Sequence, residues 1–401
     1  MDERRQRLPL VVGAGLLILS VALGARLTFG LFMGPISGSH AASLPLIAFA
    51  LAIQNLIWGV VQPIVGSLSD RYGPGRVVAC GAVVFASGLT LVALHPNAVT
   101  IVLGLGILVG VALSATTFSV VVSAVSQAAS EKQRATAVAL ATAGGSLGQV
   151  ALVPVVQSIL VLSNYERALL VLALLALALI PAGWALGSSR APSADPGIPR
   201  AGTSWAAMRT ALLDRNYLFL TAGFFACGFQ LSFIAIHLPT YLSMCHLAPN
   251  VGVTSLALIG FFNIIGSYGF GKMMDHVAPQ RLLAVLYTIR SSAILAFIAM
   301  PPTVITTLVF ASVMGLAWLG TVPLTNGVIA RLYGVKNLGA LFGVCFLSHQ
   351  VGSFLGAWLG GLSLQLTGSY ETMWVVLIVV GYGGALLNIP IRIKEPAIAT
   401  V

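Results

Sequence analysis

Charge is scarce in this sequence. Only 7% of the 401 residues are charged, whereas 58% are hydrophobic, and the mean hydropathy is +0.99. A soluble domain of this size needs far more polar residues to cover its surface. The composition therefore excludes an ordinary soluble protein and predicts one that lies in a lipid bilayer.

Acidic residues are the scarcest charged type, and none lies in the middle of an apolar segment. The ten fall in predicted loops or at helix ends: Asp2, Glu3, Asp70, Glu131, Glu166, Asp195, Asp214, Asp275, Glu371 and Glu395. A membrane site for a cationic substrate would need a carboxylate. Their absence from the apolar segments therefore counts against such a site.

Cysteine and catalytic motifs are also sparse. The four cysteines have no CxxC spacing and lie in or beside apolar segments, which predicts small packing residues with no disulfide and no metal: Cys80, Cys227, Cys245 and Cys345. The sequence has no nucleophile–base arrangement and no Gly-rich phosphate loop. We therefore predict no enzyme activity, no cofactor and no direct use of ATP.

Long apolar segments are abundant and predict an all-α membrane protein with 12 transmembrane helices. The predicted helices are 8–34, 43–67, 76–94, 98–123, 134–161, 165–187, 216–243, 250–271, 281–299, 303–328, 337–364 and 370–391. The first is too long for the apolar region of a signal peptide and contains Arg26, so we expect it to remain uncleaved.

The sequence repeats itself after about 204 residues. The matching positions are Gly24-Ala-Arg-Leu-Thr-Phe29 with Gly228-Phe-Gln-Leu-Ser-Phe233, Pro35 with Pro239, Gly66, Asp70 and Arg76 with Gly271, Asp275 and Arg281, and Gly148 with Gly352. The repeat predicts two pseudo-symmetric six-helix bundles around a central cavity, at 1–189 and 216–401, joined by a cytoplasmic linker at 190–215. Such repeats are typical of transporters that alternate access to a site between the halves.

Lysine and arginine concentrate in alternate loops, so the net charge of +10 reflects topology and does not indicate a nucleic-acid partner. This pattern predicts a multi-pass protein of the inner or plasma membrane with both termini cytoplasmic. One chain contains a whole pathway, which favours a functional monomer. In the linker, Trp205, Met208 and Leu212 have helical spacing, which fits either a helix on the membrane surface or a plain linker.

Two arginines lie inside apolar segments, Arg26 in the first helix and Arg290 in the ninth. An intramembrane charge costs several kcal/mol and is a candidate functional residue. No acid is available there, and a guanidinium suits a carboxylate ligand, so the substrate is predicted to be anionic. Arg26 corresponds in the repeat to Gln230, which we expect to face it across the pseudo-twofold axis. The alternative for both arginines is a structural bond to backbone carbonyls.

Neutral polar residues in the apolar helices complete the predicted substrate site. The candidates are Arg26, Gln230, His237, Asn55, Gln149, Asn263, His349, Gln350 and Arg290. His237 and His349 are also candidates for a coupling proton, because imidazole titrates near neutral pH. For each residue, an interhelical hydrogen bond or a satisfied core position is the alternative.

The segment Gly66-Ser-Leu-Ser-Asp-Arg-Tyr-Gly73, with Arg76, resembles the loop signature of the major facilitator superfamily, and Gly271 to Arg281 resembles a degenerate copy. The resemblance covers the whole chain and implies two six-helix bundles with rocking-type alternating access. It also implies a cytoplasmic conformational latch between the halves. The latch residues would be Gly66, Asp70, Arg71, Gly73, Arg76 and Asp275.

Other stretches resemble the bacterial branch of the monocarboxylate porter and oxalate/formate antiporter group. They are Gln54-Asn-Leu-Ile-Trp-Gly59 with Gln62-Pro63, His237-Leu-Pro-Thr-Tyr241, Trp318-Leu-Gly-Thr-Val-Pro323 and Ser348-His-Gln-Val-Gly-Ser353. Better-known members of that group pair an acid and an arginine in helix eight, where this sequence has Asn263 and Ser267. The resemblance therefore supplies no charged pair, and Arg26 must meet the charge of an anion.

These observations predict a secondary carrier of a small organic anion, a monocarboxylate, working by proton symport or anion exchange. Proton-driven efflux of hydrophobic drug-like compounds is the alternative within transport, since Phe, Met and Gly are abundant. A sensor or membrane scaffold is a third hypothesis. The partners predicted are the anion, a coupling proton and the lipid bilayer.

Overall fold

The predicted all-helical membrane fold is confirmed by the computed structural model, which describes residues 2–187, 205–334 and 338–393. Twelve helical segments of the described chain are long and apolar enough to cross a bilayer. Each predicted range falls on one of them: Leu8–Gly38, Leu44–Tyr72, Pro74–Leu94, Ala98–Ala128, Thr136–Leu162, Tyr165–Leu186, Arg215–Met244, Pro249–Met273, Pro279–Ala299, Val304–Tyr333, Leu338–Thr367 and Glu371–Asn388.

The first six spans are built from α1 (Asp2–Gly38), α2 (Leu44–Tyr72), α3 (Pro74–Leu94), α4 (Ala98–Ile101), the π-helix η1 (Val102–Leu108), α5 (Val109–Thr116), α6 (Phe118–Ala128), α7 (Glu131–Leu162), α8 (Tyr165–Leu177) and α9 (Leu179–Leu186). The second half contains α10 (Trp205–Leu213), α11 (Arg215–Met244), α12 (Pro249–Met273), α13 (Pro279–Ala299), α14 (Val304–Leu316), α15 (Thr321–Tyr333), α16 (Leu338–Thr367) and α17 (Glu371–Asn388). The helix predicted from Trp205 onward is therefore present as α10. Residues 190–204 of the predicted linker lie outside the described residues.

Polar side chains mark where several helices begin. The Asn97 side chain accepts from the backbone N–H groups of Val99 and Thr100, and Asn164 accepts from that of Arg167. Thr303 starts α14 in the same way. Such caps satisfy N–H groups that have no partner inside the helix. Polar residues in these loops therefore also fix where these spans start.

Three spans are interrupted, which hydropathy does not indicate. The fourth contains η1 and then breaks at Thr117, whose backbone is extended between α5 and α6. The sixth changes helix at Ala178, and the tenth breaks between Leu316 and Thr321. Interrupted helices at membrane depth are tolerated where neighbouring groups satisfy the backbone. Two of these breaks contact residues of the candidate site described below.

The repeated glycines lie where long helices cross most closely. A Cβ at Gly24 of α1 would lie 2.7 Å from the Gly148 carbonyl oxygen of α7, and one at Gly148 would collide with the backbone of Ser20. In the second half, a Cβ at Gly228 of α11 would collide with the His349 carbonyl of α16. Small residues allow this approach of helices in membranes. Close contacts at glycine therefore join the first and fifth spans of each half.

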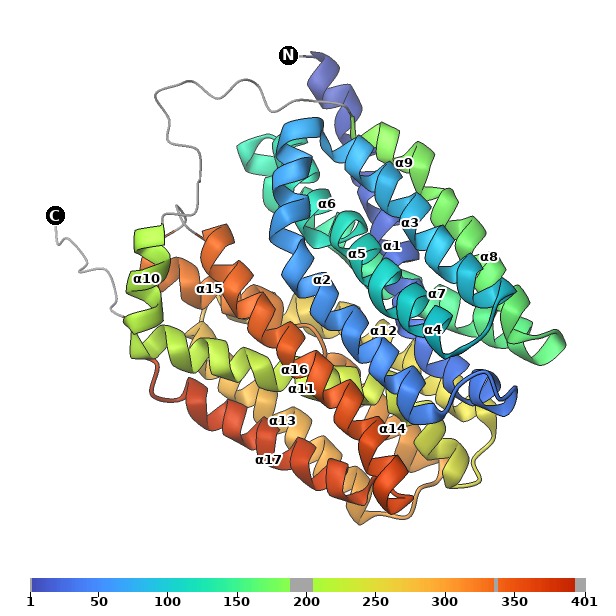
Figure 1. The fold of residues 1–401 in the computed structure, drawn as a ribbon. Helices are drawn as coiled ribbons and strands as arrows, with labels where there is room; N and C mark the ends of the chain where they lie inside the picture. Colours follow the sequence, from blue (N-terminus) through green and yellow to red (C-terminus); the bar gives the residue numbers. More distant parts are fainter. Residues whose placement is uncertain (1, 188–204, 335–337, 394–401) are drawn as a thin grey trace, which may run out of the picture.

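The two halves lie side by side, with α1–α9 in blue to green and α11–α17 in lime green through yellow to red (Figure 1). Pairs α2–α16, α7–α12 and α1–α11 join them. A Cβ at Gly30 would lie 2.5 Å from the Ala235 carbonyl oxygen, and one at Gly361 would lie 2.6 Å from the Ala48 Cβ. These close contacts lie toward the side that carries the 38–44 and 244–249 loops.

On the opposite side, where α1 begins and α17 ends, several glycines have open space beside them. A Cβ added at Gly66, Gly271 or Gly343 would meet no atom within 4 Å. In Figure 1 the α2 and α15 ends on this side lie apart. The halves are thus in close contact at one end of their interface, whereas at the other end the α2 and α15 ends lie apart.

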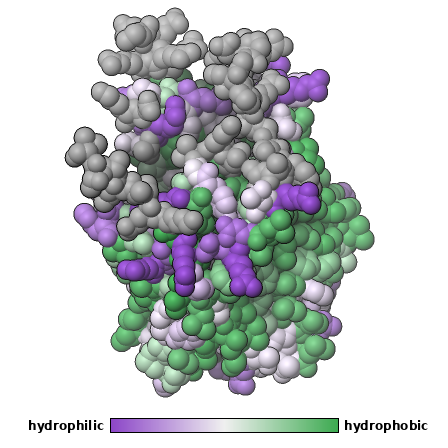
Figure 2. All heavy atoms as spheres, turned by 90° about the vertical axis from the view of Figure 1, so that its left-hand side faces the viewer, coloured by the Kyte–Doolittle hydropathy of each residue, from purple (hydrophilic) through white to green (hydrophobic). Residues whose placement is uncertain are grey.

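The surface agrees with a membrane location. Figure 2 shows a broad hydrophobic area over the lower part of one face, with hydrophilic side chains gathered toward the end where the chain termini lie. Exposed apolar side chains such as Leu174, Trp184 and Ile305 are 69%, 70% and 74% exposed. Large exposed apolar areas mark contact with another apolar phase. The chain is a multi-pass membrane protein.

Candidate functional site

Arg26 on α1 points toward α2, close to the boundary between the halves. Its Nη2 donates to the Oδ1 atom of Asn55 at 2.6 Å. The Asn55 amide nitrogen in turn donates to the Leu51 carbonyl at 2.9 Å and to the Ser232 hydroxyl of α11 at 3.3 Å. These bonds fix the Asn55 amide so that its oxygen faces the guanidinium. Asn55 therefore connects Arg26 to the second half.

An aromatic side chain forms the second side of this site. Asn55 and Trp58 are three residues apart and share a face of α2. The Arg26 guanidinium carbon lies 5.2 Å from the Trp58 ring centroid, a cation–π distance. The indole N–H donates to the Thr117 hydroxyl at 3.0 Å, at the break between α5 and α6. This break therefore orients the ring beneath the guanidinium.

Trp58 continues into a row of rings that crosses to the second half. The Trp58 and Phe346 centroids are 5.4 Å apart with an interplanar angle of 74°, and the Phe346 and His349 centroids are 5.8 Å apart at 5°. We call Trp58, Phe346 and His349 the aromatic row. Phe346 and His349, both on α16, are partly exposed. The row gives the site an apolar wall from the opposite half.

Arg26 keeps hydrogen-bonding capacity that the protein does not use. Its Nε atom is buried without a hydrogen-bond partner, and no described acidic residue forms an ion pair with it. The side chain as a whole is partly exposed. An unpaired charge in a low-dielectric site is costly, and an anion with two oxygens would relieve that cost. The arrangement is suited to binding a carboxylate.

Arg290 occupies a different environment and is fully buried. Its Nη2 donates to the carbonyl oxygens of Ala317 at 2.7 Å and Trp318 at 2.9 Å, which are left free where α14 ends. Its guanidinium carbon lies 5.4 Å from the Tyr287 ring centroid. Of the two alternatives for Arg290, the structure therefore shows the structural one. Arg290 donates hydrogen bonds to carbonyl oxygens at the break in the tenth span.

We expect Arg290→Met to destabilise the protein by at least about 2 kcal/mol, because two carbonyl oxygens lose a charged donor. Thermal unfolding of the purified protein in detergent measures this effect. Arg281→Met, at an exposed position on the same helix, is the matched control and should leave the unfolding midpoint unchanged. Equal midpoints for both variants would contradict the structural role of Arg290.

Gln230 does not face Arg26, contrary to the expectation from the repeat. Its side-chain nitrogen donates to the Leu377 carbonyl of α17 at 3.0 Å and to the Ser291 hydroxyl at 3.3 Å, and its oxygen accepts from Arg290 at 3.5 Å. These partners hold the amide inside the second half. Two residues further along α11, Ser232 is the residue that reaches the Arg26–Asn55 pair.

His237 also lies apart from Arg26. It is fully buried, with Nε2 2.8 Å from the Ala357 carbonyl and Nδ1 3.0 Å from the Tyr370 hydroxyl. Nε2 must carry the proton that the carbonyl accepts, and Nδ1 has the Tyr370 hydroxyl as its hydrogen-bond partner. Both nitrogens are therefore used within the second half, as expected of a satisfied core histidine.

The remaining polar candidates join the halves. The Gln149 side-chain nitrogen donates to the Leu256 carbonyl at 2.7 Å, and the Asn263 amide donates to the Ser146 hydroxyl at 2.8 Å. Gln350 is buried against Gly59, while His349 remains partly exposed beside it. Of the candidates, the structure thus brings Arg26 and Asn55 together, and places His349 at the far end of the aromatic row.

The predicted latch residues lie at the connections α2–α3 and α12–α13: Gly66, Asp70, Arg71, Gly73, Arg76 and Asp275. Gly73 has φ 90°, a left-handed value that favours glycine. Asp70, Arg76 and Asp275 are exposed, and none of these three forms an ion pair with another described residue. The role of these residues as a latch stays a prediction.

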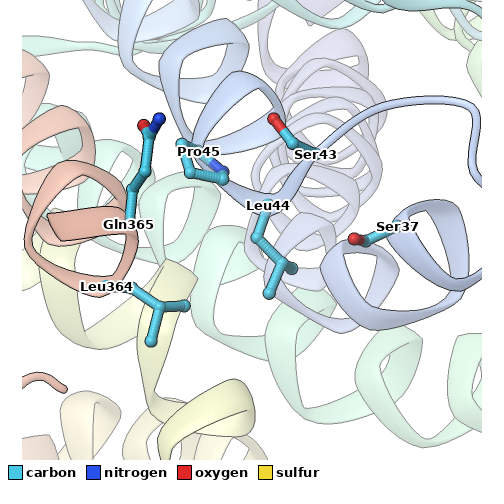
Figure 3. A pocket seen from close by; sticks show the side chains of 6 residues that line it. All are labelled: Ser37, Ser43, Leu44, Pro45, Leu364 and Gln365. Carbon is cyan, nitrogen blue, oxygen red and sulfur yellow. The ribbon is translucent and has the colours of Figure 1, made fainter. Parts of the chain in front are cut away.

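A separate pocket lies at the closed end of the interface, where the α1–α2 connection meets the end of α16. It has a volume of about 290 Å³ and is lined by Ser37, Ser43, Leu44, Pro45, Leu364 and Gln365 (Figure 3). None of these side chains is charged. One turn before Leu364 and Gln365, Gly361 packs against Pro45 and Ala48. The pocket offers no counter-charge for an anion.

Sequence reasoning missed Trp58, Phe346 and Ser232. Aromatic and serine residues are common in apolar helices and gave no separate signal. The only available clue was spacing, since Trp58 lies one turn from Asn55 on the same face of α2.

Comparison with known proteins assigns the chain to a family. A family model described as Major Facilitator Superfamily matches residues 14–357. The chain belongs to this superfamily. As a member of the Major Facilitator Superfamily with twelve apolar spans in its described part, it is a membrane transporter.

Individual relatives are similar over most of their length. The Bacillus subtilis protein named uncharacterized MFS-type transporter YcxA is 25% identical over 93% of this chain and 92% of its own. Monocarboxylate transporter 13 of Rattus norvegicus is 24% identical over 92% of this chain and 86% of its own. Monocarboxylate transporter 11 of Homo sapiens is 28% identical over 82% of this chain and 70% of its own.

Proposed function

We propose that this superfamily member transports a small monocarboxylate by alternating access between its two halves. The observation that carries the proposal is Arg26, an intramembrane guanidinium with an unused buried donor and no acidic partner among the described residues. A carboxylate supplies the missing charge and accepts two hydrogen bonds from a planar fork.

The number of charges favours an anion with one carboxylate. Of the described lysines and arginines within the spans, Arg26 and Arg290 are the two that lie away from the span ends. The Nε atoms of both arginines lack a partner, but Arg290 is fully buried and its Nη2 donates to two backbone carbonyls, whereas Arg26 is partly exposed. This leaves Arg26 as the guanidinium that a substrate can reach. A dicarboxylate would bring a second charge with no counterpart, at a cost of several kcal/mol. The names of the relatives from rat and human also support a monocarboxylate.

The conformation supports the transport cycle proposed here. The halves are joined near Gly30 and Gly361, and we propose that they open on the side of Gly66 and Gly271, where an added Cβ would meet no atom within 4 Å. The positive-inside pattern places both termini in the cytoplasm, in the inner or plasma membrane of the cell. The open side then faces the cytoplasm, and a single chain forms the pathway. The site at Arg26 lies between the two ends.

Coupling is proposed to be proton symport or exchange of one anion for another. For symport, His349 is the proposed proton site, because its ring is partly exposed whereas both nitrogens of His237 are engaged. Imidazole changes its charge near neutral pH. Exchange requires no such group. The two mechanisms give different responses to a pH gradient.

Uptake of labelled anions into proteoliposomes tests this function and its coupling. We expect lactate, pyruvate or benzoate to enter, and oxalate and succinate to be excluded. Stimulation by an acidic exterior would identify symport, and stimulation only by unlabelled anion inside would identify exchange. If no monocarboxylate enters, the proposal is wrong. Transport of neutral or cationic hydrophobic compounds instead would favour the drug-efflux alternative.

A further inference from the structure

We propose that the transported monocarboxylate carries an aromatic ring, which lies on the aromatic row while its carboxylate binds Arg26. This inference rests on the proposed function and narrows it. It follows from the side chains around the Arg26 guanidinium, of which some are polar and others are aromatic.

The side-chain nitrogens of Asn55 and Trp58, the two residues that contact the Arg26 guanidinium, are already paired. The Asn55 amide nitrogen donates to Leu51 and Ser232, and the Trp58 indole N–H donates to Thr117. A hydroxyl or keto group next to the carboxylate would therefore find no free protein partner at these atoms. Specific recognition of such a group requires an unpaired hydrogen-bonding atom in the site. Asn55 and Trp58 thus give no reason to favour a hydroxy acid.

The other groups near the guanidinium are rings. The Arg26 guanidinium carbon lies 5.2 Å from the Trp58 ring centroid, and the Trp58 and Phe346 ring centroids are 5.4 Å apart. In a carboxylate–guanidinium pair with benzoate, the substrate ring centroid lies about 7 Å from that carbon. This places the ring at the distance of the aromatic row, where edge-to-face contact is favourable.

The partners for the two ends of the substrate come from different halves. Arg26 and Trp58 belong to the first half, whereas Phe346 and His349 belong to α16 of the second, and the α16 pair is partly exposed. A rigid aromatic acid would therefore contact both halves at once. A shorter aliphatic acid bound at Arg26 would contact mainly the first half. Binding energy that spans both halves is what an alternating-access carrier can use.

The test compares benzoate with cyclohexanecarboxylate, which has similar size and charge but no aromatic ring, and with lactate. Each is used as a competitor of labelled benzoate uptake in proteoliposomes. We expect wild-type protein to bind benzoate about three- to tenfold more tightly than cyclohexanecarboxylate, the range typical of one aromatic pair.

Phe346→Leu should remove that preference while leaving the affinity for cyclohexanecarboxylate unchanged. The matched control is Phe354→Leu on the same helix, because Phe354 packs against Phe49 and Trp358 and not against Trp58. The control variant should keep the wild-type preference. The wild-type comparison stands even if Phe346→Leu fails to fold.

The outcomes separate this inference from the proposed function. If monocarboxylates are transported in an Arg26-dependent way but benzoate has no advantage, the aromatic substrate class is wrong and the function stands. An equal loss for both acids in Phe346→Leu would also overturn the ring contact. If no carboxylate is transported at all, both proposals fail.

Discussion

Arg26→Gln is expected to lower the rate of monocarboxylate uptake by about 100-fold or more, since a charged, bidentate contact contributes up to about 3 kcal/mol to binding. Glutamine keeps a hydrogen-bond donor for Asn55 but has no charge. The Arg26–Asn55 bond of 2.6 Å and the contact with Trp58 would both be weakened. Uptake by reconstituted protein, normalised to the folded fraction, measures the effect.

Arg26→Lys is the informative companion variant. Lysine retains the charge but lacks the planar fork that binds a carboxylate through two nitrogens. We expect uptake between that of wild type and Arg26→Gln. Normal uptake by Arg26→Gln in folded protein would show that Arg26 is structural, and the anion site would have to lie elsewhere.

Gly228→Ala is expected to have the largest effect on stability. A Cβ at this position collides with the His349 carbonyl of α16, and backbone atoms cannot rotate away as a flexible side chain can. Inserting one carbon in a tightly packed interior typically costs about 1–3 kcal/mol, and a clash with backbone lies at the upper end. We expect a lower unfolding midpoint in detergent and a lower yield of monodisperse protein.

The repeat provides a second site and a control for the same experiment. Gly148→Ala in the first half should destabilise comparably, because its Cβ collides with the backbone of Ser20. Gly271→Ala should have little effect, since no atom lies within 4 Å of its Cβ position. Wild-type stability of Gly228→Ala and Gly148→Ala would contradict the close crossing of these helices.

The number and position of the spans were predictable because each must present about 20 apolar residues to lipid. The interruptions at Thr117 and after Leu316 were not predictable in this way. Hydropathy is unchanged when a helix breaks, because the residues stay apolar while neighbouring groups satisfy the backbone. The Arg290 guanidinium is one of those groups, which is why a charge in that span has a structural explanation.

The repeat predicted which helices correspond but not where each side chain points. It correctly related close packing of α1 on α7 to that of α11 on α16. It failed for Gln230, because Arg290, Ser291 and the Leu377 carbonyl hold the Gln230 amide inside the second half, whereas Arg26 bonds to Asn55. Local partners, which differ between the halves, decide the rotamer.

Symmetry survives best at the contacts between the halves. A Cβ at Gly59 of α2 would lie 2.8 Å from Gln350 of α16, and one at Gly260 of α12 would lie 3.0 Å from Gln149 of α7. In both cases a glutamine on the fifth span of one half packs against a glycine on the second span of the other. Glycine permits this approach because it has no side chain.

The measurement that tests the central claim most directly is ligand-induced thermal stabilisation of the purified protein by benzoate, benzamide and phthalate, which differ in charge. A ligand that binds the folded state raises stability by about 2.7 kcal/mol at 100 times its dissociation constant. The account predicts that benzoate alone raises the unfolding midpoint, and that Arg26→Gln removes the effect. Equal stabilisation by benzamide, or by benzoate in Arg26→Gln, would contradict a site in which one guanidinium selects a singly charged anion.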